Sequence, residues 1–460
     1  MIRILHILNR ITGDGPTRSL ITLADSQRRL GLPYEHCIVT LAYEAYPLAL
    51  VRAAQAGIQI KRAPSTHQLQ LEISKADIVQ LHVWNNPTIY GILRMQWPAA
   101  RLLMHVRILG LHAPQVVTPQ IATMADYCVT TARATITDTA ISQQRHKMCI
   151  FSVSNFRRVA SCEPAAHVGF NVGYIGTTNY GKLHRAFVSM SSAAHIPNVK
   201  FIVCGGIDPT LQRDIERSID PTRFDVRGYI EDIASVLSIC DVFGYPLNKD
   251  SYATSDKTLQ DAMYTGVPPV IFADSALTQF VTHGQTGLVV NSAEAYTQAL
   301  ETLYHHPAER KRLGDNARRY ARQTLSPSTV AQQFDDVYRA MLVRPKRNRC
   351  WSGISPSSSA AHRFIEAMGA AAPQFAQSMK MGNSAEHQAA DTKIMQSSPL
   401  LVGGEGGIMQ YRNTYPDDAW LRYWAGLILF AQARHEKANI EFRASVQLGV
   451  GQARVAPYLT

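Results

Sequence analysis

The stretch FNVGYIGTTNYGKLHRAFVSM, residues 170–190, decides the fold class of this chain. It opens with an apolar run typical of a strand, and a glycine turn at Gly176 and Gly181 and a helical stretch follow. A glycine turn between a strand and a helix lets backbone amides approach phosphate oxygens. This order of elements predicts one unit of a parallel sheet.

Similar apolar runs recur on both sides of this stretch, with helical stretches between them. The earlier runs begin at Ile2, His36, Ala76, Arg101 and Asp126, and the later ones at Lys200, Cys240, Val267 and Thr286. This rhythm predicts an α/β protein with two Rossmann-like, doubly wound domains. A polar stretch at residues 157–169, which contains Pro164, is predicted to link them.

The chain divides on this basis into four parts. We expect an N-terminal domain at residues 1–160, a second domain at 168–343, a linker with amphipathic helices at 344–400 and a helical hairpin at 401–460. In the hairpin, Gly426, Ala438 and Phe442 occupy the small, small and aromatic positions of a tetratricopeptide repeat, which it resembles. An ordinary hairpin packed on the body of the protein is the alternative.

The composition is that of a globular protein. Hydrophobic residues make up 46% and charged residues 18%, which favours buried cores over disorder. The seven cysteines form no C-x-x-C pair, and neither a signal peptide nor a run of ~20 apolar residues occurs. We therefore expect a cytoplasmic protein with reduced thiols. A net charge of +11 is compatible with anionic ligands such as phosphates, acidic lipids or nucleic acid, and it does not distinguish between them.

The second domain resembles the retaining glycosyltransferases of family 4, the group 1 glycosyl transferases of two-Rossmann (GT-B) architecture. Four blocks carry the resemblance in the family's order: GYIGTTNYGK from residue 173, FDVRGYIEDIASVLSICDVFGYP from 224, LQDAMYTGVPPVIF from 259 and HGQTGLVV from 283. The resemblance covers about residues 170–342. It implies the GT-B fold and transfer of a sugar, with retention, from a nucleoside diphosphate donor.

The resemblance also implies a catalytic lysine. Breaking the anomeric C–O bond places charge on the leaving diphosphate, and a cationic group has to stabilise that charge. Lys182 falls on the family's lysine, whereas Thr177 replaces its usual arginine. The alternative is a solvated lysine at a helix start. Replacement of Lys182 by alanine is expected to lower activity but hardly to change stability.

The family's paired acids, E-x7-E, are only partly present. Asp261 falls on the second acid and by resemblance would bind the ribose, but Ala253 replaces the first. Asp256 is nearby, yet on one helix it would lie ~140° from Asp261, so it can bind the donor only from the loop before the helix. The alternative for Asp256 is charge complementarity at the helix N-terminus.

Further donor contacts are implied at the edges of both domains. The expected donor-binding residues, besides Asp256 and Asp261, are Gly13, Gly15, Gly176, Thr177, Gly206, Tyr229 and Ile230. His105 ends a strand, where open sheets place ligands, and is the second catalytic candidate by resemblance. His82 also ends a strand, and for both histidines the alternative is a buried, hydrogen-bonded side chain. Val106 replaces the aspartate that follows this histidine in the family.

The sequence shows neither a D-x-D loop nor metal-ligand spacing, so we expect no metal and no other cofactor, with the sugar nucleotide as substrate. The acceptor is expected to be a glycan, a lipid-linked molecule or a protein, and no nucleic-acid partner is expected. The run RPKRNR, residues 344–349, predicts a peripheral contact with the anionic inner face of the cell membrane. A solvated linker is the alternative.

Taken together, these observations predict a metal-independent glycosyltransferase of the hexosyl class that acts in polysaccharide biosynthesis. A sugar-nucleotide 2-epimerase and a catalytically degenerate GT-B scaffold are the alternatives. The scaffold is motivated by Ala253, Thr177 and Val106, which replace three expected polar groups. A nicotinamide dehydrogenase and a nucleotide hydrolase are disfavoured because neither glycine loop completes the required motif. The sequence names neither the sugar, the base, the acceptor nor the oligomeric state.

Overall fold

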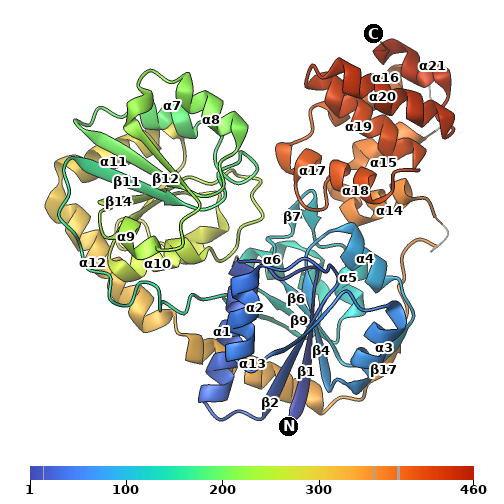
Figure 1. Ribbon diagram of the computed structural model, residues 1–460, viewed down its shortest axis with the longest axis horizontal. Coiled ribbons are helices and arrows are strands. Elements are labelled where there is room, and N and C mark those ends of the chain that lie inside the picture. The colour runs from blue at the N-terminus through green and yellow to red at the C-terminus, as the bar shows by residue number, and fades with distance from the viewer. Residues whose placement is uncertain (14, 356–357, 381–383, 460) are drawn as a thin grey trace.

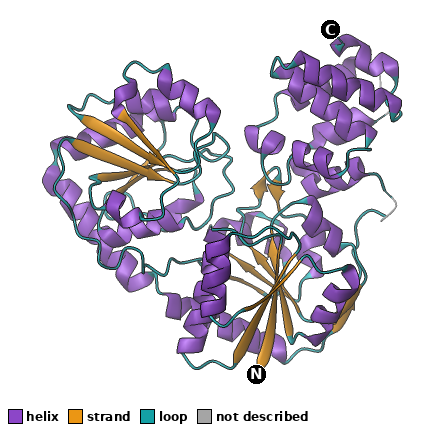
Figure 2. Ribbon diagram, viewed as in Figure 1, coloured by secondary structure: helices purple, strands orange, loops and turns teal. Residues whose placement is uncertain are grey.

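The computed structural model describes residues 1–13, 15–355, 358–380 and 384–459. Two sheet domains lie beside each other, and a helical extension sits above the N-terminal one (Figure 1). Helices cover both faces of each sheet, and the extension is almost entirely helical (Figure 2). The structure therefore confirms the predicted class of two Rossmann-like domains with a helical C-terminal extension.

The N-terminal domain contains a seven-stranded parallel sheet in the order β10-β9-β6-β4-β1-β2-β3. Its strands are β1 (Ile2–Leu8), β2 (Tyr34–Thr40), β3 (Gln59–Arg62), β4 (Ile78–Val83), β6 (Leu102–Val106), β9 (Tyr127–Thr130) and β10 (Lys147–Cys149). The helices are α1 (Gly15–Arg29), α2 (Pro47–Gln55), α3 (Thr66–Lys75), α4 (Pro87–Leu93), α5 (Pro119–Met124) and α6 (Arg133–Asp138). All five predicted apolar runs of this domain are strands.

The second domain contains a six-stranded parallel sheet in the order β13-β12-β11-β14-β15-β16. Its strands are β11 (Phe170–Ile175), β12 (Val199–Cys204), β13 (Phe224–Gly228), β14 (Val242–Tyr245), β15 (Pro269–Phe272) and β16 (Leu288–Val290). The helices are α7 (Phe187–Ser192), α8 (Pro209–Glu216), α9 (Ile233–Leu237), α10 (Lys257–Thr265), α11 (Ala293–His305) and α12 (Pro307–Thr324).

Helix α13 (Pro327–Leu342) crosses back to the N-terminal domain, although we placed its residues in the second domain. Its apolar face, which includes Phe334 and Tyr338, packs in one cluster with Ile4 and Leu103 of the N-terminal sheet. The Tyr338 hydroxyl also donates to Gln80 Oε1 at 2.6 Å. The chain thus leaves the second domain at α12, and a second connection joins the domains.

The extension packs on the N-terminal domain at the carboxyl ends of its strands (Figure 1). Its helices are α14 (Ala360–Met368), α15 (Pro373–Met379), α16 (Ser384–Met395), α17 (Pro399–Gly403), α18 (Ile408–Thr414), α19 (Ala419–Ala431), α20 (His435–Gln447) and α21 (Gln452–Val455). Phe364 and Trp424 of the extension share one buried cluster with Tyr90 and Leu93 of α4. This shared core makes the extension part of the N-terminal body.

Helices α19 and α20 form the predicted hairpin. Gly426 faces Phe442 so closely that a Cβ at Gly426 would lie 2.5 Å from the ring. Ala438 and Phe442 are fully buried in the same cluster. The hairpin packs on α16 and α18. Its likeness to a tetratricopeptide repeat stays a prediction, and this packing is also what the alternative, an ordinary packed hairpin, predicts.

The basic run at residues 344–349 binds the N-terminal domain. Strand β17 (Arg347–Arg349) pairs with β5 (Trp97–Ala100) in an antiparallel ribbon. Arg347 and the buried Arg349 both form ion pairs with Asp126, and Arg344 and Lys346 donate to backbone carbonyls of this domain. These partners contradict the solvated linker, the alternative for this run, because its cations hold the start of the extension in place. Contact with a membrane stays a prediction.

Among the described residues, no helix combines the length and the apolar character that a membrane crossing requires.

Candidate functional site

A cleft of about 500 Å³ lies between the two sheet domains. Its walls come from the loops that follow β1, β4 and β6 of one sheet and β11, β12, β13 and β14 of the other. In each sheet the order reverses beside the first strand, between β1 and β4 and between β11 and β14. Open α/β sheets bind ligands at the carboxyl ends of strands at such reversals. The fold therefore places one ligand site between the domains.

Most of the residues predicted for donor binding and catalysis line this cleft. Those that do are Gly13, Gly15, Gly176, Thr177, Lys182, Gly206, Tyr229, Ile230 and Asp256. His105 and Asp261 do not, and both are buried behind its wall. Asp14, which stands in the first glycine loop, lies outside the described residues.

Glycine is required where the loops after β11 and β12 meet. Gly205 has a φ of +151°, and a Cβ there would lie 1.9 Å from the carbonyl oxygen of Gly176. The Gly176 amide donates to the Cys204 carbonyl, and the Gly205 amide to the Gly228 carbonyl. These close backbone contacts shape the floor of the cleft at the switch point.

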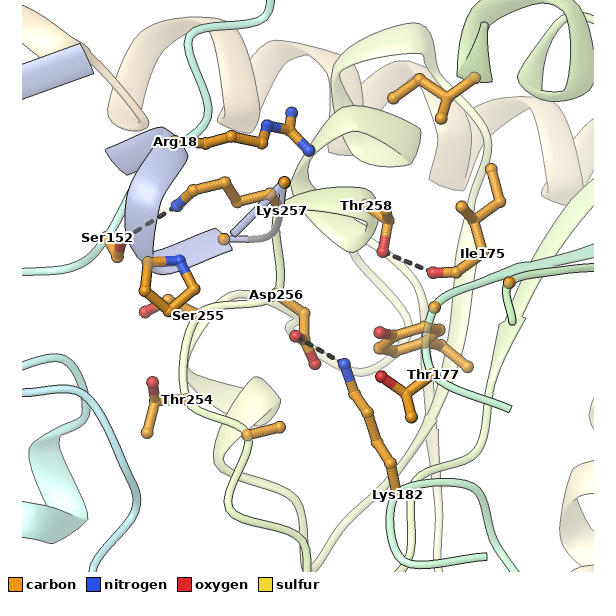
Figure 3. Close-up of a pocket in the computed structure, with 18 of the residues that line it drawn as sticks. Arg18, Ser152, Ile175, Thr177, Lys182, Thr254, Ser255, Asp256, Lys257 and Thr258 are labelled. Carbon is orange, nitrogen blue, oxygen red and sulfur yellow. Dashed lines mark hydrogen bonds and ion pairs between the residues drawn. The ribbon is translucent and has the colours of Figure 1, made fainter. Parts of the chain in front are cut away.

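Lys182 forms an ion pair with Asp256 inside the cleft, with 2.9 Å between Nζ and Oδ1 (Figure 3). The lysine is only 8% exposed, which excludes the solvated lysine that the sequence left open. Burial lowers the pKa of Lys182, but the negative charge of Asp256 together with the nearby tyrosines Tyr245, Tyr174 and Tyr252 outweighs it and raises that pKa well above its usual value. Lys182 is therefore held charged in the cleft.

Asp256 lies in the loop before α10, as donor binding from this position requires. It is the N-cap residue of the helix, yet its side chain makes no capping hydrogen bond. Its Oδ1 binds Lys182, and its Oδ2 is buried without a hydrogen-bond partner in the described part of the chain. The carboxylate thus faces the cleft with one oxygen unused, which a capping role would not explain.

Helix α10 directs its N-terminus at the cleft. Thr258 donates to the carbonyl of Ile175 at the end of β11, and Lys257 donates to Ser152 Oγ (Figure 3). The helix ends at Gly266, whose φ is +87°. A helix N-terminus carries partial positive charge and attracts anions.

Asp261 lies on the buried side of α10 and is fully shielded from solvent. Ser154 Oγ donates to its Oδ1 at 2.6 Å, and Arg18 lies 3.8 Å from its Oδ2. Burial raises the pKa of Asp261, against the opposing effect of Arg18. In this structure the carboxylate fixes Arg18 at the cleft wall, and its contact with a ribose stays a prediction.

Basic side chains dominate the cleft. Among the described residues, its lining contains five lysines and arginines but a single carboxylate, that of Asp256; the five are Arg18, Arg107, Arg158, Lys182 and Lys257. Burial, and then the charges of Arg107 and Arg18, lower the pKa of Lys257 well below its usual value. Arg158 Nη2 is buried and has no hydrogen-bond partner within the described ranges. The cleft therefore favours an anion that accepts several hydrogen bonds.

Sequence reasoning missed four of these five basic side chains. Arg18 stands near the start of α1, just after the first glycine loop, and Arg158 stands in the stretch assigned as a linker. Arg107 directly follows the strand of His105, and Lys257 directly follows Asp256. The signal that could have found these residues is the position of a basic residue next to a predicted strand end or helix start.

The loop that carries Ala253 closes the cleft against the N-terminal domain. Thr254 and Thr131 share a hydrogen bond of 2.7 Å, and Ser255 donates to the carbonyl of Thr131. The Leu109 amide donates to the carbonyl of Tyr252. Gln279 donates to the carbonyl of Thr254. Ala253 itself lines the cleft without a polar side chain.

At the rim, Tyr229 is 63% exposed and donates to Glu231. Glu231 also pairs with Arg52 of α2 at 3.0 Å, so the rim links the two domains.

The histidines of the N-terminal sheet form a buried row behind the cleft. Arg107 Nε can only donate, so His82 Nδ1 accepts its hydrogen bond at 2.9 Å. His82 therefore carries its proton on Nε2 and donates it to His6 Nδ1 at 3.0 Å. By the same reasoning His6 donates to His36 Nδ1 at 2.8 Å, and His36 donates to Gln27 Oε1 at 2.9 Å. Each group in the row thus donates a hydrogen bond to the next one, from Arg107 at one end to Gln27 at the other.

His105 lies beside this row, where Gln80 Nε2 donates to its Nδ1 at 2.8 Å. It lines a small cavity that also borders Arg107 and Ser152. Burial lowers the pKa of His105 well below its usual value. The geometry matches a buried, neutral histidine, the alternative that the sequence left open.

No group of three or more histidine, cysteine, aspartate or glutamate side chains in the described part of the chain is arranged to hold a metal ion.

Comparison with known proteins agrees with this fold. Residues 169–306 match the family described as Glycosyl transferases group 1. No curated protein matches the chain significantly. Among solved structures, HepE from Anabaena in complex with UDP and glucose is 14% identical, with a TM-score of 0.61 and coverage of 74% of this chain and 100% of that one.

Two further solved structures show the same fold. A glycosyltransferase from Rickettsia africae is 14% identical, with a TM-score of 0.60 and coverage of 75% of this chain and 99% of that one. Sucrose-phosphate synthase from Thermosynechococcus elongatus is 16% identical, with a TM-score of 0.57 and coverage of 74% and 99%. The chain thus has the GT-B fold of these proteins.

Proposed function

We propose that the protein is a glycosyltransferase that uses a nucleoside diphosphate sugar bound in the interdomain cleft. One observation carries this proposal: the cleft contains an excess of basic side chains with an unused donor, Arg158 Nη2, and an unused acceptor, Asp256 Oδ2. A diphosphate accepts hydrogen bonds from the first, and a hydroxyl group donates to the second. A sugar nucleotide supplies both groups in one molecule.

In this proposal each region of the cleft binds one part of the donor. The diphosphate lies among Lys182, Arg158 and Lys257 at the N-terminus of α10, and the base lies near Tyr229 and Ile230. The sugar lies against the loop of residues 252–255, where backbone groups take the place of the missing acid at Ala253. Uridine is the base to test first, because HepE was solved with UDP and with UDP-glucose.

The chemistry follows from this placement. The anomeric C–O bond breaks, and the leaving diphosphate keeps the electron pair and takes up the proton of the acceptor hydroxyl. The oxygen of that hydroxyl forms the new bond to the anomeric carbon. The basic side chains stabilise the charge that develops on the leaving group. Retention at the anomeric carbon and the hexosyl class follow from the resemblance to family 4.

We expect the protein to release UDP from a UDP-hexose in the presence of a cell extract that supplies acceptors, and to do so at an unchanged rate in EDTA. The reason is that side chains and amides neutralise the diphosphate here. Mass spectrometry of the extended acceptor and a coupled UDP assay check both parts.

Two results would contradict this expectation. Turnover that EDTA abolishes and Mn²⁺ or Mg²⁺ restores would make the enzyme metal-dependent. Binding of UDP-sugars without release of UDP would favour the degenerate scaffold, which the replaced groups at Ala253, Thr177 and Val106 motivate.

The acceptor carrier, whether glycan, lipid-linked molecule or protein, stays a prediction, as do a cytoplasmic location, membrane contact and a role in polysaccharide biosynthesis.

A further inference from the structure

A second cavity, of about 320 Å³, adjoins the interdomain cleft. The two share Pro16, Trp84 and Tyr252 in their walls. Trp84 and Tyr252 come from different domains and meet edge to face, with ring centroids 5.1 Å apart. The loop that carries Tyr252 therefore separates the interdomain cleft from the second cavity and lines both.

The extension forms one side of this cavity through the segment Leu400 to Glu405. Leu400 contacts Gly181 of the second domain, where a Cβ would lie 2.9 Å from Leu400 Cδ2. The same cavity is bordered by Asn179 of that loop. The cavity is thus enclosed by all three parts of the chain, and it lies beside the loop that carries Lys182.

A glycine-rich loop, GGEGG at residues 403–407, brings Glu405 into the cavity. Gly406 has a φ of +80°, and a Cβ there would lie 2.0 Å from the carbonyl oxygen of Asn85. Only glycine permits this approach to the loop after β4. Asn85 in turn donates to the carbonyl of Ala367 in α14, which ties the same loop to the extension.

The carboxylate of Glu405 is held from one side only. Asn9 Nδ2 and Asn86 Nδ2 both donate to Oε1, at 3.2 and 2.7 Å. Gln115 Nε2 donates to the Glu405 backbone carbonyl, which fixes the residue further. Oε2 accepts no hydrogen bond from any described residue. One carboxylate oxygen is therefore positioned, and the other is free to accept a hydrogen bond from water or from a ligand hydroxyl.

We propose that this cavity is the acceptor subsite and that Glu405 binds a hydroxyl group of an acceptor sugar. The inference rests on the proposed glycosyltransferase function. The cavity combines an aromatic wall, Trp84 and Tyr252, with carboxylate and amide side chains such as Glu405 and Asn9. A sugar ring offers an apolar C–H face to the first and hydroxyl groups to the second. Its position beside the cleft brings the acceptor hydroxyl toward the donor sugar.

The test measures UDP affinity by calorimetry and saccharide binding on an array of immobilised mono- and oligosaccharides, with and without saturating UDP. The variants are Glu405→Gln and Glu405→Asp, with Glu436→Gln as a matched control at an exposed site on α20. Glutamine keeps the oxygen that Asn9 and Asn86 bind but replaces the second oxygen with a donor. We expect Glu405→Gln to weaken saccharide binding about ten- to a hundredfold while UDP affinity and the control stay unchanged.

The outcomes separate the inference from the proposed function. If the wild type binds UDP but no saccharide, or if Glu405→Gln keeps wild-type saccharide binding, the acceptor subsite is refuted. A wild type that fails to bind UDP contradicts the proposed function instead. Amide hydrogen exchange in α18 shows whether Glu405→Gln loosens the extension. If it does, Glu405→Asp is the deciding variant, because it keeps the charge but shortens the side chain. Undiminished saccharide binding by Glu405→Asp would overturn the inference.

Discussion

Replacement of Lys182 by alanine is expected to lower kcat/KM by a factor of about 10²–10³, the range for the loss of one preorganised group that stabilises developing charge. Lys182 is the cation that Asp256 holds in place, and Thr177 stands where the family has a second cation. Steady-state kinetics with a UDP-hexose measure the effect. A folded variant with near-wild-type turnover would contradict the catalytic role.

The structure changes the expected cost of this variant in stability. Loss of a surface lysine would hardly change the free energy of unfolding. Lys182, however, is buried, and Asp256 Oδ2 already has no hydrogen-bond partner among the described residues. Removal of the lysine leaves a half-buried carboxylate without its ion pair, which costs about 1–3 kcal/mol. The double variant Lys182→Ala/Asp256→Asn is the control: we expect it to regain stability and to stay inactive, which separates catalysis from folding.

Acidification from pH 7.5 to 5.5 is expected to remove about 5 kcal/mol of stability from the N-terminal body. Burial, as the largest cause, lowers the pKa of His6, His82 and His105 well below the ordinary value and that of His36 to about 4. These rings stay neutral in the folded protein, whereas the unfolded chain takes up a proton on each below about pH 6.5. Each histidine therefore contributes a loss of about 1.4 kcal/mol per pH unit below that value.

Urea unfolding followed by tryptophan fluorescence measures this loss. All five tryptophans, Trp84, Trp97, Trp351, Trp420 and Trp424, lie outside the second sheet domain, so their signal reports the N-terminal body and the extension. His36→Gln should reduce the pH-dependent loss by about a quarter, since it removes one of the four rings. His435→Gln, at an exposed site on α20, should leave it unchanged. An unfolding free energy that is equal at both pH values would contradict neutral, buried histidines.

Local sequence pattern was sufficient for most of the fold, because strands buried on both faces are continuous apolar runs. Strand β3 was not predicted, since its sequence QIKR is mostly polar and lies at the sheet edge. Helix α13 was placed in the wrong body because its amphipathic pattern shows a buried face without showing which sheet covers it. The docking of the extension depends on contacts such as Arg94 with Glu366, which are far apart in the sequence.

Some residues of the candidate site could also be predicted from local sequence pattern, and others could not. The glycine turns and Lys182 could be predicted because they follow strands that the pattern already located. Asp256 and Asp261 were compared on one helix, but Asp256 is the residue before it, so the angle between them does not apply. Arg158 and Glu405 were not predicted, since both reach a cavity through loops whose path depends on the packing of separate domains.

The most direct test of the central claim is a calorimetric titration of the full chain with UDP. We compare wild type, Arg158→Gln and, as a control with the same change in charge, Lys437→Gln in the exposed part of α20. The account predicts that wild type and control bind UDP equally and that Arg158→Gln binds it about ten- to a hundredfold more weakly, since a charge-assisted hydrogen bond is lost. Absence of UDP binding by the wild type, or equal affinity in all three proteins, would contradict a diphosphate site in the interdomain cleft.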